Sequence, residues 1–307
     1  MSQTSGVFGA LSDQVRKTIV DFVSEGLNEL EPSHPKLFKQ VDTTSKFIRK
    51  QSIAPFGTMP RKGEGDEYSF DNIQPGYSKD ITPLEYGFGF QWTETSQEDD
   101  EYDVLAQYSK WLGFSARVLQ ETQAALIFTN GFTSQLTADG LSLFNTAHTL
   151  KRGGTTKNRL STDSDMSVSS IDQMRADMRS NTKLESGQLV RPARDFFLLH
   201  HPDNEGLALR IVKSEKLQGT ADNDMNHLNG GTMNLTPLAW EYLGDADAFF
   251  LVAKKTSAHG LIQVNRVKPK LSAKQTSWQT GNLIVTIRCR QAWDSFDWRN
   301  VAGTPGA

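Results

Sequence analysis

The sequence predicts an α+β protein built around one unusually long helix. Apolar residues recur at spacings of three and four between residues 96 and 131, which is typical of one buried helical stripe. Proline or glycine recurs every few residues between 36 and 95, and strand and helix patterns alternate between 166 and 262. The chain has 307 residues, is 37% hydrophobic and contains 24 Gly and 11 Pro. We therefore expect one large domain or two modest ones, with much loop or extended arm.

The charge balance and the single cysteine exclude several classes of protein. The formal net charge is −3 and neither end is rich in lysine or arginine, so nothing supplies the phosphate neutralisation that non-specific nucleic-acid binding requires. Cys289 is the single cysteine, which rules out an intramolecular disulfide framework and fits a reducing compartment. Residues 1–5 lack the features of a signal peptide, and no apolar run approaches membrane-spanning length. We expect a soluble protein, made in the cytoplasm, without a membrane partner.

The N-terminal 35 residues predict an amphipathic helix that ends at a proline-rich break. Two interpretations stay open: this helix docks on another molecule as an arm, or it folds back on its own core. Its apolar positions are Phe8, Leu11, Val15, Ile19, Phe22, Val23, Leu27 and Leu30.

Residues 36–95 predict an extended two-stranded ribbon. Aromatic residues alternate with small or polar ones in 68–70 and again in 86–92, where they are Tyr86, Phe88, Phe90 and Trp92. The turn-rich tip between residues 60 and 66 carries Arg61, Lys62, Glu64 and Asp66. A two-stranded ribbon is marginally stable alone in water, so its aromatic residues need a surface from this chain or from a neighbour.

The long helix is predicted to span residues 96–131. The acidic run 95–101 suits a helix N-terminus, and Asn130-Gly131 suggests a left-handed cap at the other end. The predicted buried stripe comprises Val104, Leu105, Tyr108, Trp111, Leu112, Val118, Leu119, Ala125, Leu126 and Phe128. About 33 residues at roughly 1.5 Å each would form a rod of about 50 Å. A coiled coil is the weaker interpretation, because no other segment offers a sustained heptad partner.

The remaining chain predicts a mixed α/β unit followed by a long strand pair. Helices are expected at 168–182 and around 204–214, and strands at 196–199 and 249–252. Alternation in 262–267 and 283–289 predicts an outgoing and a returning strand, with Cys289 as a buried, inert thiol. The tail from residue 302 onward is not expected to be ordered on its own.

Histidines and a serine offer candidate catalytic or metal-binding groups, but their context argues against that chemistry. His200 and His201 are adjacent on a predicted strand, so they point to opposite faces and cannot easily share a metal ion. Asp139, His148 and Ser142 could be combined into a hydrolytic triad, yet Ser142 lacks a nucleophile-elbow glycine pattern.

Two loops superficially resemble ligand-binding motifs. Residues 151–157 contain two glycines between basic residues but lack the ending of a phosphate-binding loop, so we expect a solvated basic loop. Residues 220–226 alternate like a calcium loop but lack its central glycine and final glutamate, so we expect a turn. We expect no catalytic residues, no cofactor and no metal.

Several sequence segments, named below in chain order, resemble those of the major capsid proteins of tailed phages with the Hong Kong 97 fold. Among these proteins the resemblance is to the Mu-type major head subunit group. The likeness runs from about Lys36 to Trp298. The phrases that carry it are Tyr86–Phe90 before the acidic helix start, Asp139–Phe144 with Thr146–His148, and Ile211–Ser214 followed by Gly219–Asp224 and Asn226. None of these phrases is a catalytic signature.

The resemblance implies a shell protein with five units. These are an N-terminal arm (1–45), an extended β-hairpin loop (46–95), a peripheral domain with the long spine helix (96–165), an axial domain (166–262), and return strands with a C-terminal tail of the peripheral domain (263–307). The axial domain would meet its copies at five- and six-fold centres, and the ribbon would reach across a neighbouring subunit. The predicted intersubunit contacts are Arg61, Lys62, Glu64, Asp66, Tyr86, Phe88, Phe90 and Trp92.

The resemblance also implies partners and a location. We expect hexamers and pentamers in an icosahedral or prolate shell, assembled in a bacterial cytoplasm and found in the virion. The shell would enclose double-stranded DNA without sequence-specific binding. A separate scaffolding protein, a portal protein and a decoration protein are the expected partners. The alternatives are the shell of an encapsulin-like nanocompartment and, third, a small oligomeric hydrolase that uses His148 or the pair His200-His201.

Overall fold

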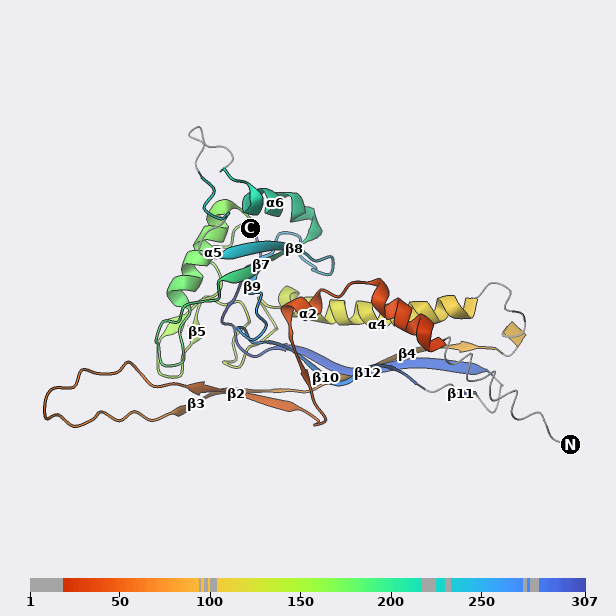
Figure 1. The fold of residues 1–307 in the computed structure, drawn as a ribbon, viewed down its shortest axis with the longest axis horizontal. Helices are drawn as coiled ribbons and strands as arrows, with labels where there is room; N and C mark the ends of the chain where they lie inside the picture. The colour runs from red at the N-terminus through yellow and green to blue at the C-terminus, as the bar shows by residue number, and fades with distance from the viewer. Residues whose placement is uncertain are drawn as a thin grey trace.

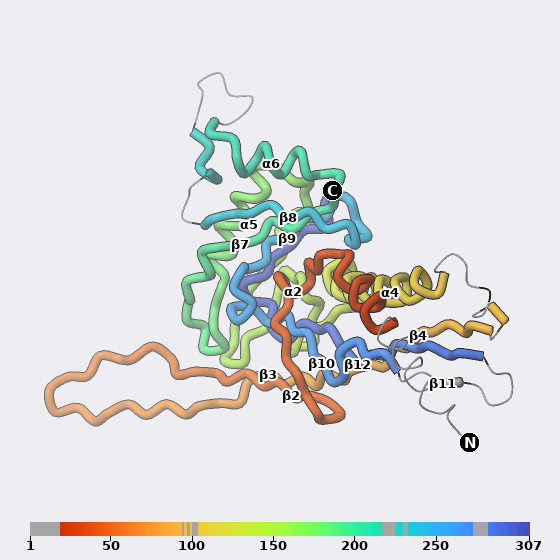
Figure 2. Tube along the Cα trace, turned by 45° about the vertical axis from the view of Figure 1, so that its right-hand side comes forward, coloured from red at the N-terminus to blue at the C-terminus, as the bar shows by residue number. Residues whose placement is uncertain are grey.

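The computed structural model describes residues 19–93, 95–96, 99, 104–216, 225–229, 233–272, 275–276 and 282–307. The molecule is wide and flat, with three parts that spread away from a shared centre (Figure 1). A long helix lies along one sheet on the right of this view, a smaller α/β unit stands above, and a thin hairpin extends to the left. The same arrangement holds in the turned view (Figure 2).

The long sheet contains the strand pair predicted near the C-terminus. β10 (Leu261–Leu271) and β12 (Leu283–Ser295) are antiparallel, with β1 (Lys39–Asp42) beside β10 and the short β11 (Gln275–Thr276) beside β12. β4 (Leu84–Trp92) pairs with the other side of β12 over nine residues. Alternate side chains of β12 are buried, including the predicted inward residue Cys289.

The long helix exists, but its buried face is only partly the predicted one. α4 spans Val104–Thr129, 26 residues, or about 39 Å. Leu112 and Phe128 are buried as expected, whereas Trp111 is 58% exposed and Tyr108 41%. The acidic run before residue 104 falls mostly outside the described residues. The helix ends close to the predicted position, but without the left-handed cap, because neither Asn130 nor Gly131 has a positive φ.

Small residues decide which face of α4 is buried. A helix over residues 19–29 crosses it so closely that a Cβ on Gly113 would lie 2.1 Å from the carbonyl oxygen of Val23. A Cβ on Gly26 would lie 1.9 Å from the carbonyl oxygen of Lys110. Large aromatic side chains cannot occupy such a crossing, so they turn outward. The described part of the N-terminal amphipathic helix therefore folds back on its own subunit, which settles that alternative for residues 19–29.

The ribbon is shorter than predicted. β2 (Ile48–Ala54) and β3 (Gln74–Ile81) form its antiparallel base, and residues 55–73 continue beyond them without strand pairing. The expected strand at 68–70 is therefore wrong. The aromatic alternation in 86–92 does mark a strand, but that strand is β4 of the long sheet and not part of the ribbon.

The α/β unit contains the two helices and the two strands predicted for it, together with two strands that were not predicted. Its sheet has the order β13-β9-β7-β8, and β7 runs parallel to β8 but antiparallel to β9. The strands are β7 (Asp195–His200), β8 (Asn234–Ala239), β9 (Phe249–Ala253) and β13 (Val301–Thr304), and the helices are α5 (Val168–Asn181) and α6 (Glu205–Lys213). The other short elements of the described residues are α2 (His34–Leu37), the 3-10 helix η1 (Pro202–Asn204), and the hairpin of β5 (His148–Thr149) with β6 (Thr155–Thr156).

The C-terminal tail is ordered because its first part pairs with the α/β unit, a partner that the sequence did not reveal. Residues of β13 pair with the outer edge of β9 and are fully buried. A Cβ on Gly303 would lie 2.5 Å from the Phe250 ring, so the glycine permits this close approach. The same ring packs with Phe128 and Phe144 in a core that joins the end of α4 to the α/β unit.

Candidate intersubunit surfaces

The ribbon tip exposes an unusual amount of apolar surface. Phe70 is 93% exposed, Met59 90% and Tyr68 76%. Exposed apolar residues in a group, as opposed to single ones, mark interaction sites. Phe56 and Ile73, nearer the base of the ribbon, are exposed as well, with 52% and 60% of their areas accessible. The described chain thus does not bury the ribbon tip.

The four predicted tip charges lie on this exposed segment. Arg61, Lys62, Glu64 and Asp66 are all exposed. The Lys62 ammonium lies 4.9 Å from the centroid of the Tyr68 ring, and Asp66 accepts a hydrogen bond from the backbone of Gly63. These local contacts shape the tip but leave its charges accessible to a partner. Their role in an intersubunit contact stays a prediction.

Polar contacts tie the outer ribbon to its own subunit. The Arg152 guanidinium donates to both carboxylate oxygens of Asp71, at 2.7 and 3.0 Å, and to the backbone oxygen of Asn72. The hydrogen bond from Arg152 holds the pKa of Asp71 below its usual value. Nearer the base, Lys79 donates to Asp294 of β12 at 2.5 Å. Because the Arg152–Asp71 pair is partly solvent-exposed, we regard it as a weak tether.

The aromatic residues of β4 divide into two groups. Tyr86, Phe90 and Trp92 are partly buried and pack against their own subunit's core. Phe88, in contrast, is 65% exposed. The structure therefore gives three of the four predicted contact aromatics a partner within the chain, and leaves Phe88 available.

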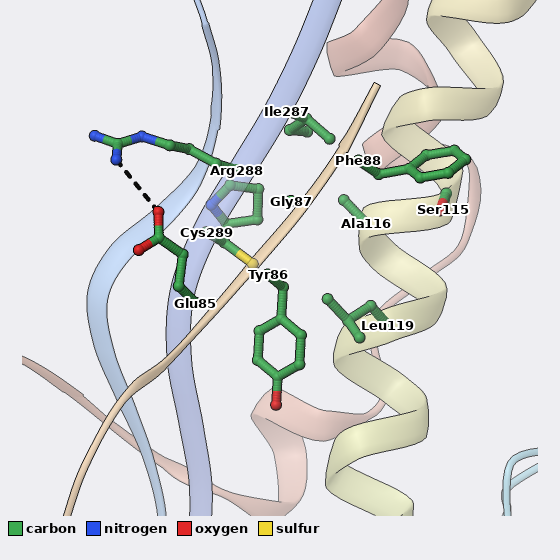
Figure 3. Close-up of a pocket in the computed structure, with 11 residues that line it drawn as sticks. Glu85, Tyr86, Gly87, Phe88, Ser115, Ala116, Leu119, Ile287, Arg288 and Cys289 are labelled. Atoms are coloured by element: carbon green, nitrogen blue, oxygen red, sulfur yellow. Dashed lines mark ion pairs between the residues drawn. The ribbon is translucent and has the colours of Figure 1, made fainter. Parts of the chain in front are cut away.

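Phe88 borders a groove between β4 and α4 (Figure 3). The groove has a volume of about 400 Å³, with Ala116 and Leu119 on the helix side and Tyr86 on the strand side. Cys289 also lines the groove, and burial raises the pKa of this thiol, which suits an inert residue. Exposed aromatic residues continue along α4 next to this groove, where Tyr108 contacts Trp111 with ring centroids 5.8 Å apart. We call Phe88, Tyr108, Trp111 and Phe114 the aromatic surface.

A buried carboxylate connects three parts of the subunit. Glu121 of α4 accepts hydrogen bonds from Nδ1 of His34 at 2.8 Å and from Nε1 of Trp240 at 2.9 Å. The backbone nitrogen of Ser33 donates to it as well, at 2.9 Å. Burial opposes ionisation of this carboxyl, but the bonds from His34 and Trp240 outweigh it, so the pKa of Glu121 lies below its usual value. The sequence analysis missed this site, since a glutamate in an amphipathic helix normally faces solvent.

The suggested triad does not form. Nδ1 of His148 lies 2.7 Å from Asp139, and the imidazole stacks on Trp298 at 4.6 Å between centroids. Its Nε2 faces acceptor oxygens of Leu143 and Asn158. Ser142 donates elsewhere, to the backbone oxygen of Phe144. His148 is therefore a buried structural residue, and the hydrolase hypothesis loses its geometric basis at this position.

The other candidate ligand sites also lack the necessary arrangement. Nδ1 of the buried His200 lies 2.8 Å from the backbone oxygen of its neighbour, whereas His201 pairs with Asp203. Of residues 151–157, the first four lie in the turn between β5 and β6, as expected for a loop, whereas Thr155 and Thr156 form β6 itself. The suggested calcium-like run falls mainly outside the described residues. Within the described ranges, no group of three or more His, Cys, Asp or Glu side chains could hold a metal ion, and no helix could cross a membrane.

Comparisons with known proteins agree with this architecture. A family profile described as phage capsid protein matches residues 76–303, and no protein of curated function matches. The solved procapsid of bacteriophage JBD30 is 14% identical, with a TM-score of 0.52, over 97% of this chain and 76% of that chain. The capsid of Cyanophage P-SCSP1u is 10% identical, with a TM-score of 0.61, over 90% and 88%. A virus-like particle from Pyrococcus furiosus is 10% identical, with a TM-score of 0.54, over 92% and 96%. At such identities the structures show a shared fold, the one predicted from the sequence.

Proposed function

Because this chain belongs to the phage capsid protein family, we propose that its copies form pentamers and hexamers of a closed head that encloses double-stranded DNA. It is a major capsid protein with the Hong Kong 97 fold. Membership of the Mu-type group stays a prediction. The observation that carries the proposal is the ribbon tip, whose exposed apolar residues need burial that the described chain does not supply.

The ribbon tip of one subunit lies, in this proposal, on the aromatic surface of the next. Phe70 and Met59 offer apolar area on one side of the contact, and Trp111 and Phe88 offer it on the other. Burying both sets removes apolar surface from water, which is the main favourable term in protein association. Arg61, Lys62, Glu64 and Asp66 then flank this contact as a polar rim. Tyr86, Phe90 and Trp92 support the aromatic surface from within the subunit.

The five predicted units are proposed as the working parts of the shell. The axial domain (166–262) surrounds the five- and six-fold centres, and the peripheral domain carries α4 and the long sheet. β4 belongs physically to that sheet, although the proposed ribbon unit (46–95) includes it. The same contacts repeated head to tail close into rings, as heterologous contacts do when the rotation closes.

The role is structural, and the proposed partners follow from the family. They are a scaffolding protein, a portal protein and a decoration protein, with assembly in the bacterial cytoplasm. The family resemblance suggests them, and each is open to test by co-purification. DNA is proposed to be enclosed without sequence-specific contacts.

A cellular nanocompartment shell is the second candidate, because the same fold occurs in a particle from Pyrococcus furiosus that is described only as virus-like. The family match to phage capsid proteins argues against it. The two differ in contents, since a nanocompartment would enclose a protein cargo and a phage head would enclose DNA.

Electron microscopy of the purified protein, expressed alone and with its neighbouring genes, tests the proposal. Rings of five or six subunits, or closed shells, would support it. A uniform monomer or dimer under both conditions would contradict it. Nuclease-protected DNA within shells from the co-expression would distinguish a head from a nanocompartment.

A further inference from the structure

One edge of the sheet in the axial domain is strongly basic. This basic edge is made by Arg179, Arg191, Arg194, Lys254 and Lys255. Arg194 directly precedes β7 and Arg191 lies three residues before it. The backbone nitrogen of Lys254 donates to the backbone oxygen of Asp195, the first residue of that strand. The three arginines line one hollow of about 310 Å³. Asp195 is an exposed carboxylate at the same edge, and Asn234 donates to it at 2.9 Å.

The opposite edge of the same sheet is acidic. This acidic edge is made by Asp203, Glu205, Glu241, Asp245 and Asp247. These residues follow the ends of β7 and β8 or precede β9, so they gather where His200 pairs with both Ala239 and Phe249. A hydrogen bond from Asn204 to the backbone oxygen of Ala246 joins the two loops. The nearby basic side chains are Arg210 of α6 and His201, which pairs with Asp203, and the carboxylates outnumber them.

The two edges face away from each other. β7 has six residues, so the edges are separated by about 20 Å along the strands. That distance exceeds the Debye length of about 8 Å at physiological ionic strength, so the edges scarcely attract each other within one subunit. In Figures 1 and 2 the loop before β7 and the loop after β8 lie on opposite sides of this unit.

A second copy of this chain fits both edges at once. A surface that carries complementary charges on opposite sides pairs head to tail, and such a heterologous contact closes into a ring when the rotation allows. A nucleic acid would suit the basic edge alone and would leave the acidic edge unexplained. Charge complementarity across a contact also fixes its register and suppresses wrong pairings.

We propose that the basic edge of each axial domain binds the acidic edge of the next copy around the five- and six-fold centres. This inference rests on the proposed shell function and adds to it the polarity and the residues of the ring contact. The ring is thus held by two surfaces with different chemistry. The apolar ribbon contact clamps neighbouring subunits, and the charged edges set their direction around the axis.

Charge-reversed variants test this polarity. Variant A carries Arg191→Glu, Arg194→Glu and Lys255→Glu, which makes both of its edges acidic. Variant B carries Asp203→Lys, Glu241→Lys and Asp247→Lys, which makes both edges basic. All six side chains are exposed, so we expect both subunits to fold, which circular dichroism would verify. A third variant with all six changes reverses the polarity but keeps the edges complementary.

Alone, variants A and B should need about ten times more protein than the wild type to form rings in 150 mM NaCl. The variant with all six substitutions should assemble like the wild type. Mixed in equal amounts, A and B should alternate around a ring. Alternation closes with six subunits but not with five, so the mixture should form hexamers, sheets or tubes without pentamers.

The outcomes separate this inference from the proposed function. If the wild type forms shells and variants A and B do so at the same concentrations, the edges are not the ring contact and the shell function stands. The inference also fails if the wild type assembles while neither the mixture of variants A and B nor the variant with all six substitutions does. If the wild type forms neither rings nor shells, the shell function itself fails, and the ring contact with it. A salt titration of wild-type rings is an independent check, because the rings should dissociate more readily as NaCl rises from 50 to 500 mM.

Discussion

Replacing Glu121 by alanine should remove the contacts that connect the N-terminal segment, α4 and the axial domain, and should therefore lower the stability of the subunit. The carboxylate is 1% exposed and accepts bonds from His34, Trp240 and the backbone of Ser33. The substitution leaves these donors buried without an acceptor. Removing one partner of a buried ionic contact costs about 3–5 kcal/mol. At roughly 2–4 °C per kcal/mol, the unfolding midpoint of the unassembled subunit should fall by about 10 °C.

The matched control is Glu85→Ala, the same change at an exposed glutamate. Glu85 is 56% exposed and pairs with Arg288 at 3.5 Å and Arg290 at 4.0 Å. Exposed pairs of this kind contribute at most about 1 kcal/mol, so the midpoint should barely move. Both variants would be compared by thermal unfolding of dissociated subunits. Equal, small losses for the two variants would show that Glu121 does not connect the N-terminal segment to α4 and the axial domain.

Three further predictions follow from the same structure. Deleting residues 58–67 should leave folded subunits that assemble poorly, as seen by electron microscopy. Normal particles from this deletion would show that the ribbon does not clamp neighbouring subunits. Trp111→Ala removes a largely exposed ring that contacts Tyr108, so it should cost no more than about 1.5 kcal/mol of subunit stability yet weaken assembly. Leu112→Ala, at a buried position, should cost about 2–5 kcal/mol. A larger stability loss for Trp111→Ala than for Leu112→Ala would mean that the helix face predicted from the sequence is the buried one. Acid should destabilise the subunit. Burial alone would raise the pKa of Glu121, but its hydrogen bonds have the larger, opposite effect, so the folded-state pKa lies below the unfolded-state value of about 4.3. The ionised carboxylate therefore contributes stability above that value, and the contribution is lost as the pH falls through the lower folded-state pKa. Glu121→Gln should flatten stability measured between pH 5 and 2, and an unchanged slope would refute this.

Local patterns predicted most elements because those elements bury residues at a fixed period. Alternate residues of β12 face the core, so its strand was visible from Leu283, Val285 and Ile287 alone. Helix α5 was equally visible from its serine-rich start, where Ser167 caps the first turn. In both cases the information lies within a few neighbouring residues.

The prediction failed where a distant segment decides the outcome. Trp111 looked like a core residue, but the close helix crossing at Gly113 and Gly26 selects a face lined by small side chains. Glu121 is buried because Trp240, 119 residues away, donates to it. The tail is ordered because Gly303 fits against Phe250. None of these partners can be located from sequence spacing, since each depends on the tertiary fold.

The structure divides the subunit into a stiff body and a weakly held ribbon, which bears on how one sequence fits both pentamers and hexamers. The glycine crossing, the Glu121 contacts and the shared aromatic core join the N-terminal helix, α4 and the axial domain. The outer ribbon is held mainly by exposed polar contacts such as Arg152 with Asp71, which cost little to break. We therefore expect the body to move as one piece while the ribbon changes its angle to follow the neighbouring subunit. Arg152→Ala should widen the range of ribbon angles among classified particle images, whereas Glu121→Ala should reduce subunit stability. If Arg152→Ala left the ribbon as well defined as in the wild type, the ribbon would be set by its base and not by this tether.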